Sequence, residues 1–550
     1  MHGFRTTLVS TVFAAAALST AGFQPARADD DRRAVVGRDY KHVLLISVDG
    51  MHAIDLQRWI HDNPSSAIAG LASQGVVYPN AYTTAPSDSY PGMLAQVTGG
   101  TPKTAGLFYD DSYDREEYPS KASYTSQGLA DPGCVGNPGT EVTNFEELDK
   151  TYNYATGVVA DLAGGGTLGQ VYTQLDPDHM QRKLIGGKCT PVYPHQYVRT
   201  NTIFEVIKQA GLRTVWSDKH PAYEDLSGPS GQGLDELFAP EINSQDLLDP
   251  GAQTGDDYTT SYTGVRTYDA IKVKAVLNWI DGYDSTRAKK EPVPAIFGMN
   301  FQAVSVGQKL AKAGHADADK SLTGGYLDAE ATPGPALKLQ LDFVDDALGR
   351  FKQELKAQGL DESTLIIVSA KHGQSPIDVK DRLAISDALY GATPGFGTHG
   401  FEICDDEALV WLAPELQKAI NPATGNPYYA DAKAYILANA AQLQIAKLLD
   451  REELGELYED PFHNSRVPDF IAVTNHGVIC TGGSKLAEHG GFSHDDRNVA
   501  LLVSAQHLAP ATVGDTVYTT QIAPTILHAL GLDPNALQAV QVEGAQVLNR

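Results

Sequence analysis

Short apolar segments alternate along this chain with longer segments of helical periodicity, and this alternation restricts the fold more than any other feature. His42–Val48, Leu365–Ser369 and Asn498–Val503 have the length and composition of buried strands. Amphipathic patterns over 53–73 and Leu337–Gln358 predict helices. Strands that are apolar on both faces and separated by helices form a mostly parallel sheet with helices on each side. The sequence therefore predicts an α/β fold.

Further elements and insertions follow from the same reasoning. Helices are expected over 201–211, Met93–Thr98, Thr520–Leu530 and Asp431–Leu449, and a strand at Arg213–Trp216. The stretches 112–198, 226–265 and 312–334 are rich in loop-forming residues and predict insertions over the carboxyl edge of the sheet. We expect one large domain over 29–550, with a possible small subdomain at about 377–465.

The first 28 residues have the pattern of a secretory signal peptide. Arg5 precedes an apolar run from Leu8 to Leu18, and Ala26-Arg-Ala28 supplies a small-residue cleavage site. No later segment approaches the ~20 consecutive apolar residues of a membrane span. We therefore expect a secreted or periplasmic protein without a membrane span.

Charge and cysteine content agree with that location. The chain carries a formal net charge of −26, which argues against nucleic acid as a generic ligand. It leaves small phosphate esters open, because a local metal ion can reverse the local field. Four cysteines in an exported chain predict two disulfides. Pairing Cys134 with Cys189 and Cys404 with Cys480 keeps each bridge within one region, although the sequence leaves the other two connectivities open.

Chemically active residues follow the predicted strands directly. Asp49 and His372 stand at strand ends, and His489 lies between a glutamate and glycines. Ligands bind beyond the carboxyl ends of strands in open α/β sheets, and an aspartate with neutral histidines suits a zinc-type site. Taken singly, Asp49 is more typical of a turn residue and His372 of a structural histidine, and His489 would fit a plain glycine turn.

A serine nucleophile is predicted in Ala85–Gly92, just before the helical Met93–Thr98. Ser87 or Ser89 would stand at a helix N-terminus, where free N–H groups and the helix dipole favour a phosphate. Either serine is also a typical N-cap. A second polar segment, Trp216–Pro221, follows a strand and offers Lys219 and His220, but its composition favours a surface turn.

These motifs resemble, in order, those of the type I phosphodiesterase/nucleotide pyrophosphatase family of the alkaline phosphatase superfamily. The matching segments are Ser47–Gly50, Pro86–Pro91, 344–349, Ile366–Gly373 and Glu488–Gly490, within a match from Lys41 to about Leu532. The resemblance implies an alkaline-phosphatase-like three-layer sandwich. It also implies a hydrolase in which a serine or threonine attacks phosphorus while two zinc ions hold the substrate.

Some family residues are carried over by these motifs. Ser89 aligns with the nucleophile, Asp49 and His372 with ligands of the zinc that activates it, and His489 with a ligand of the second zinc.

Other positions depart from the family pattern. Lys371 stands where the family has an aspartate ligand, and Val304 and Gln308 stand where it has an aspartate and a histidine. Asp110 replaces an asparagine that stabilises the developing oxyanion. We therefore expect a divalent-metal centre, zinc by resemblance, with one site lost. Lys371 would supply charge that a metal otherwise provides.

Three function classes are consistent with these residues. The first is a secreted phosphoric-ester hydrolase that acts on a small phosphate ester through a Ser89 phosphoenzyme. The second is a catalytically silent family member that binds a phosphorylated or sulfated ligand. The third is a sulfuric-ester hydrolase, which ranks lowest because the sulfatase motif is absent after Ser89.

Overall fold

The computed structural model describes residues 34–37, 40–142, 175–243 and 256–550. Its centre is an eight-stranded sheet of order β19-β2-β18-β11-β1-β10-β8-β9. The five strands from β11 to β9 are parallel, whereas β18 runs antiparallel to both neighbours. This confirms the predicted α/β fold with a mostly parallel sheet. The strands are β1 (His42–Val48), β2 (Gly75–Val77), β8 (Val215–Ser217), β9 (Glu236–Phe238), β10 (Ile296–Phe301), β11 (Thr364–Ser369), β18 (Leu501–Ser504) and β19 (Ala511–Thr512).

Alternate residues of β1 enter two separate cores, which explains the three layers. Val43 and Leu45 pack into a core with α3 (Ser89–Thr98), α6 (Ile203–Gln209) and α13 (Ile522–Ala529). Leu44 and Ile46 pack on the other face with α1 (Ala53–Asp62), α2 (Ala67–Ala72), α7 (Tyr262–Ile280) and α9 (Pro335–Ala357). Successive side chains of a strand point to opposite faces, so a continuously apolar strand needs helices on both sides.

The helix expected over 53–73 is two helices, α1 and α2. Asn63 ends α1 with a backbone (φ −126°, ψ 66°) outside the helical region, because the following residue is Pro64 and disfavours a helical conformation before it. Ser66 then begins α2 by accepting a hydrogen bond from the Ala69 N–H. The prediction of one continuous helix over 53–73 was therefore wrong.

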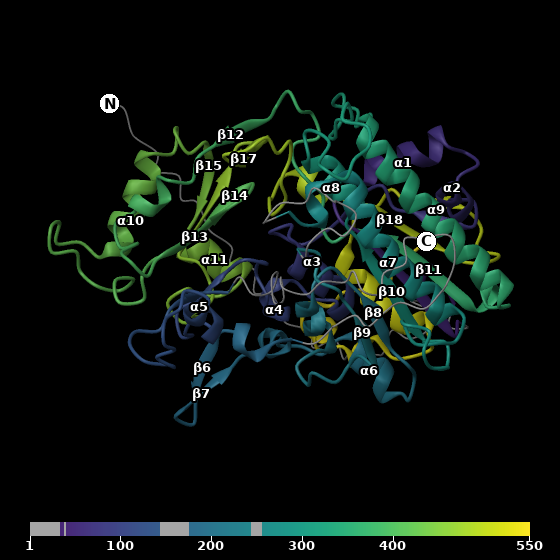
Figure 1. The fold of residues 1–550 in the computed structure, drawn as a ribbon, viewed down its shortest axis with the longest axis horizontal. Coiled ribbons are helices and arrows are strands. Elements are labelled where there is room, and N and C mark those ends of the chain that lie inside the picture. The colour runs from purple at the N-terminus through teal and green to yellow at the C-terminus, as the bar shows by residue number, and fades with distance from the viewer. Residues whose placement is uncertain (1–33, 38–39, 143–174, 244–255) are drawn as a thin grey trace, which may run out of the picture.

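A second, four-stranded antiparallel sheet lies apart from the central sheet (Figure 1, left), with strand order β13-β14-β16-β15. Its strands are β13 (Phe401–Cys404), β14 (Glu407–Trp411), β15 (Ile445–Leu449) and β16 (Phe470–Thr474), and α10 (Tyr428–Ala438) packs in the same core. The helix predicted over Asp431–Leu449 was wrong beyond Ala438, because residues 445–449 pair with β16 and this long-range pairing overrides local helical periodicity. The sheet overlaps the expected subdomain at 377–465, whose independence stays a prediction.

The predicted cysteine pairing is present: Cys134 is bonded to Cys189 and Cys404 to Cys480. No helix among the described residues has the length and apolar character needed to cross a membrane. The predicted signal peptide, 1–28, lies outside the described residues, as do 143–174 of the expected insertion at 112–198. The remaining elements are β3 (Ala81–Tyr82), α4 (Pro102–Ala105), β4 (Tyr113–Asp114), α5 (Lys121–Thr125), β5 (Thr140–Glu141), β6 (Arg182–Ile185), β7 (Lys188–Pro191), α8 (Ala303–Lys309), β12 (Leu383–Ile385), α11 (Arg451–Leu457), β17 (Val478–Cys480), α12 (His494–Arg497), β20 (Val517–Tyr518) and α14 (Gln538–Glu543).

Candidate active site

Polar residues from four strands meet at the carboxyl edge of the central sheet. In the parallel register, Asp49, Gln302 and Lys371 each come two residues after a row of mutually paired residues in β1, β10 and β11. The neighbouring strand β8 extends this row and delivers Asp218 and Lys219 directly after its last residue. The register of the sheet thus gathers residues that are far apart in the sequence.

Helix α3 brings the candidate nucleophile to the same edge. Asp88 is its N-cap and Ser89 its first residue. Gly92, one turn later, allows a close approach to β11, because a Cβ at this position would lie only 2.2 Å from the carbonyl oxygen of Lys371. A larger residue would therefore push the start of the helix away from the strand end.

Ser89 lies between an ammonium group and an imidazole. Lys219 Nζ donates a hydrogen bond to Ser89 Oγ at 3.0 Å, and His372 Nε2 lies 3.2 Å from the same oxygen. His372 Nδ1 is 2.8 Å from the carbonyl oxygen of Gly373 and must donate to it. In the neutral ring Nε2 then carries the lone pair and can accept the serine proton. Ser89 is thus held beside both a cation and a candidate general base.

Lys371 is completely buried, and its ammonium group contacts Asp218 and Tyr223 instead of the candidate nucleophile Ser89. Its Nζ donates to Asp218 Oδ1 at 2.9 Å and to the Tyr223 hydroxyl at 2.8 Å. Burial lowers the pKa of Lys371, while Asp218 and Asp49 oppose that shift. Lys371 therefore supplies buried positive charge behind the nucleophile, and Lys219 is the lysine that contacts it.

Asp49 is surrounded by cations and amides. Its Oδ2 lies 3.9 Å from both Lys219 Nζ and Lys371 Nζ and 3.7 Å from His372 Nε2, and it accepts a hydrogen bond from Gln302. Although burial alone would raise the pKa of Asp49, Lys371, His372 and Lys219 together hold it well below its usual range. The carboxylate is therefore ionised and balances the two ammonium groups.

The first zinc position of the family does not fit these residues. Lys371 replaces one ligand, and two ammonium groups already stand 3.9 Å from the remaining carboxylate, where they would repel a divalent cation. Asp49 Oδ1 is buried and accepts no hydrogen bond from any described residue. The negative charge of the Asp49 carboxylate is nevertheless already balanced by Lys219 and Lys371. His372 stands at the sequence position of a family zinc ligand, but its Nε2 lies 3.2 Å from Ser89 Oγ.

The second zinc position fits no better. Val304 is buried and has no ligand atom. Gln308 Nε2 donates to the carbonyl of Gly50 at 2.8 Å and to the Tyr326 hydroxyl at 2.7 Å, while its Oε1 accepts from Gln374 at 2.6 Å. The amide is thus engaged on both sides. Two zinc ions, as the resemblance implies, do not fit the residues present.

His489 belongs to an adjoining cluster. Its ring lies 4.1 Å from that of His372, centroid to centroid, and its Nδ1 lies 3.4 Å from Asp88 Oδ1. Burial and the neighbouring Lys309 hold the pKa of His489 well below its usual range, so the ring is neutral. Asp110 also joins this cluster, next to His489 and Asp88 rather than beside Lys371.

A cavity of about 200 Å³ opens beside these residues. Lys219, Lys309, Lys485, His220 and His489 are among its lining residues. Such a concave, cation-lined space at the carboxyl edge of the sheet suits an anionic ligand.

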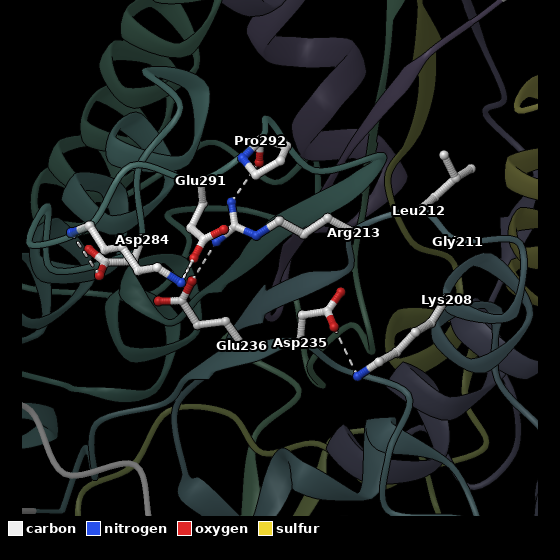
Figure 2. A pocket seen from close by; sticks show the side chains of 10 residues that line it. Lys208, Gly211, Leu212, Arg213, Asp235, Glu236, Asp284, Glu291 and Pro292 are labelled. Carbon is white, nitrogen blue, oxygen red and sulfur yellow. Dashed lines mark hydrogen bonds and ion pairs between the residues drawn. The ribbon is translucent and has the colours of Figure 1, made fainter.

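A larger surface hollow, of about 740 Å³, lies at the opposite edge of the sheet (Figure 2). Its lining carries three cations and four acids, among which Lys208 pairs with Asp235 at 2.9 Å and Arg213 with Glu236 at 2.9 Å. It has the size of a ligand site but neither a nucleophile nor an excess of positive charge, so the smaller cavity is the better candidate for an anionic ligand.

The structure brings Ser89, Asp49, Lys371 and His372 together, as the sequence predicted, with His489 beside His372. The other serine candidate, Ser87, donates its hydroxyl to a backbone carbonyl.

The expectation of a surface turn at Trp216–Pro221 was wrong. Asp218, Lys219 and His220 are buried, and none of the three is more than 6% exposed. His220 Nδ1 lies 2.7 Å from Glu241 Oε1, and burial with the cations Lys219 and Lys371 holds the pKa of His220 well below its usual range. The ring is therefore neutral, and its Nδ1–H donates to the Glu241 carboxyl group. The signal that could have found Lys219 is its place directly after a strand, which it shares with Asp49.

The central sheet with its two helical layers is an alkaline-phosphatase-like α/β fold, and comparison with known proteins agrees. The model of the type I phosphodiesterase/nucleotide pyrophosphatase family matches residues 43–496. The chain therefore belongs to this family, whose members are phosphoric-ester hydrolases. A search of curated proteins found no significant match.

Solved structures share the fold at low sequence identity. Murine ectonucleotide pyrophosphatase/phosphodiesterase 5 superposes with a TM-score of 0.51 at 14% identity, covering 90% of this chain and 96% of the murine chain. An inactive variant of that murine enzyme in complex with AMP gives the same values. Wild-type alkaline phosphatase PafA gives a TM-score of 0.56 at 14% identity, with the same coverage. These similarities support the alkaline-phosphatase-like fold.

Proposed function

We propose that this protein is a secreted phosphoric-ester hydrolase that acts through a phosphoenzyme on Ser89. The observation that carries the proposal is the position of Ser89 Oγ, 3.0 Å from Lys219 Nζ and 3.2 Å from His372 Nε2, at the N-terminus of α3. The ammonium group, together with the positive end of the α3 dipole, stabilises negative charge on a phosphate.

Lysine charge takes the place of the family's metal charge in this mechanism. Ser89 Oγ attacks phosphorus while its proton moves to His372 Nε2, and the bond from phosphorus to the leaving oxygen breaks. The leaving alkoxide takes the proton from His372. Water then attacks the phosphoserine, gives its proton to His372, and Ser89 Oγ recovers that proton as it leaves. Lys219 stabilises the equatorial oxygens, and Lys371 keeps Asp49 and Asp218 from repelling the phosphate.

Small phosphate esters are the proposed substrates. The lining of the cavity includes three lysines, which suits an anion, and one solved relative in fold was determined with AMP. A nucleotide-sized ester is therefore the first substrate class to test. Two disulfides and membership of this family support export from the cytoplasm, and mass spectrometry of the mature N-terminus tests cleavage after Ala28.

Turnover of bis-p-nitrophenyl phosphate and p-nitrophenyl phosphate by the purified protein tests the proposal. Ser89→Ala should abolish turnover, whereas Ser87→Ala, which removes a neighbouring hydroxyl, should retain it. Acid quenching of the wild type during turnover, followed by peptide mass spectrometry, should detect phosphate on Ser89.

Two results would overturn the proposal. Turnover that persists in Ser89→Ala would exclude this nucleophile. No turnover of either ester, combined with thermal stabilisation by inorganic phosphate, would favour the catalytically silent alternative. That alternative is supported by the altered positions Lys371, Val304 and Gln308.

A further inference from the structure

Three buried side chains from separate parts of the chain converge beside the proposed active site. Asp88 is the N-cap of α3, Asp110 lies before β4, and His489 lies after β17. One ligand atom from each lies within 4.8 Å of the others. The three residues are 0%, 5% and 7% exposed, respectively. Two carboxylates and an imidazole at this spacing match the donor set of a divalent-metal site.

His489 contributes a buried ring nitrogen to this cluster. His489 Nδ1 is buried, lies 3.4 Å from Asp88 Oδ1, and makes no hydrogen bond to any described residue. A buried imidazole nitrogen without a hydrogen bond is costly unless it binds something.

The charge of the surroundings also favours a cation. Three lysines line the adjoining cavity, and each lies near another carboxylate. Lys309 Nζ lies 2.7 Å from Glu488 Oε2 and Lys485 pairs with Glu488 Oε1, while Lys219 Nζ lies 3.9 Å from Asp49 Oδ2. Two buried carboxylates, Asp88 and Asp110, would gain most from a divalent ion placed between them.

The sequence pattern agrees with a displaced site. The family's second zinc loses two ligands here, at Val304 and Gln308, whereas its third ligand, His489, remains. Asp110 stands where the resemblance implies a neutral asparagine, so the chain gains a carboxylate next to the surviving histidine.

We propose that Asp88, Asp110 and His489 bind one divalent transition-metal ion of the zinc or manganese type. This ligand set shares only His489 with the family's sets. Three protein ligands leave a coordination position open, and His489 also lines the 200 Å³ cavity, so an anionic ligand in the cavity can reach the ion. Binding of the ion goes beyond the proposed function and does not depend on Ser89.

Metal content per chain tests the proposal directly. The purified full chain is dialysed against ZnCl₂ or MnCl₂, freed of excess metal, and analysed by inductively coupled plasma mass spectrometry. The wild type should hold one ion per chain, and Asp110→Asn and Asp88→Asn should lose it. The matched control Asp111→Asn removes the same charge one residue along and should retain the ion, as should Ser89→Ala.

Several outcomes would overturn the proposal. One is a wild type that holds no stoichiometric ion, and another is an Asp110→Asn variant that keeps it. Loss of the ion in Asp49→Asn but not in Asp110→Asn would assign it to the family's first position. Two ions per chain would indicate the family's pair.

A further readout does not require the variants to fold. Electron paramagnetic resonance of the Mn²⁺-loaded wild type, with nitrogen-15-labelled histidine, should detect coupling to one imidazole nitrogen. Absence of that coupling would contradict the proposed site. Because Ser89→Ala should bind the ion but not turn over substrate, failure of the metal site and failure of the proposed hydrolase remain distinguishable.

Discussion

Replacing Lys219 by methionine is the most direct test of the idea that lysine charge substitutes for metal charge. Methionine keeps an unbranched chain of similar length but removes the ammonium group. In the folded protein Lys219 Nζ donates to Ser89 Oγ at 3.0 Å and lies 3.9 Å from Asp49 Oδ2. The residue is only 6% exposed, so water cannot easily replace the lost contacts.

Two effects set the size of the expected loss. A single preorganised donor to a developing oxyanion is worth ~10²–10³ in kcat. At an effective dielectric constant of about 20, two unit charges 3.9 Å apart interact by about 4 kcal/mol, which is an upper limit for the contact between Lys219 and Asp49. We therefore expect Lys219→Met to lower kcat by ~10²–10³, with a smaller effect on KM.

Steady-state kinetics with bis-p-nitrophenyl phosphate measures this loss, and melting curves show whether each variant is folded. Lys208→Met is the matched control, because it removes the same charge in the hollow at the opposite edge of the sheet and should leave kcat unchanged. Lys219→Arg should retain part of the activity. A folded Lys219→Met variant with the kcat of the wild type would refute the reasoning.

Three other predictions concern the candidate general base His372, the buried acid Glu117, and Gly92, where α3 packs closely against β11. His372→Gln cannot accept the Ser89 proton and should lower kcat by ~10²–10⁴; unchanged kcat would exclude His372 as base. Burial raises the pKa of Glu117 to about 8 from its usual 4.5, so the folded state keeps a proton that the unfolded state loses, and stability falls as pH rises from 4.5 to 8. Glu117→Gln should then raise the unfolding free energy at pH 8 by up to roughly 5 kcal/mol, but little at pH 4, in denaturant titrations; equal gains at both pH values would contradict this. Gly92→Ala should lower activity by displacing α3 from Lys371. If this variant has the same kcat as the wild type, the close contact between α3 and β11 is not needed for activity.

Local patterns predicted β1, β8, β11 and β18 of the eight-stranded central sheet but not β2, β9, β10 and β19. β1 has the predicted bounds, and β11 begins one residue before them, because a run of apolar residues that is buried on both faces has few alternatives to a central strand. The segment 445–449 could not be predicted in this way. Its conformation depends on pairing with β16, which is distant in sequence.

The family, the fold class and the residues at the ends of β1 and β11 could all be predicted from the amino-acid sequence. These depend on short motifs, whose order and composition are visible without coordinates. Tertiary structure alone decided that Lys219 contacts Ser89, that Lys371 faces Asp218, and that Asp110 joins His489. The physical reason is that strand register and the approach of α3 fix which side chains meet, and neither is encoded within any one segment.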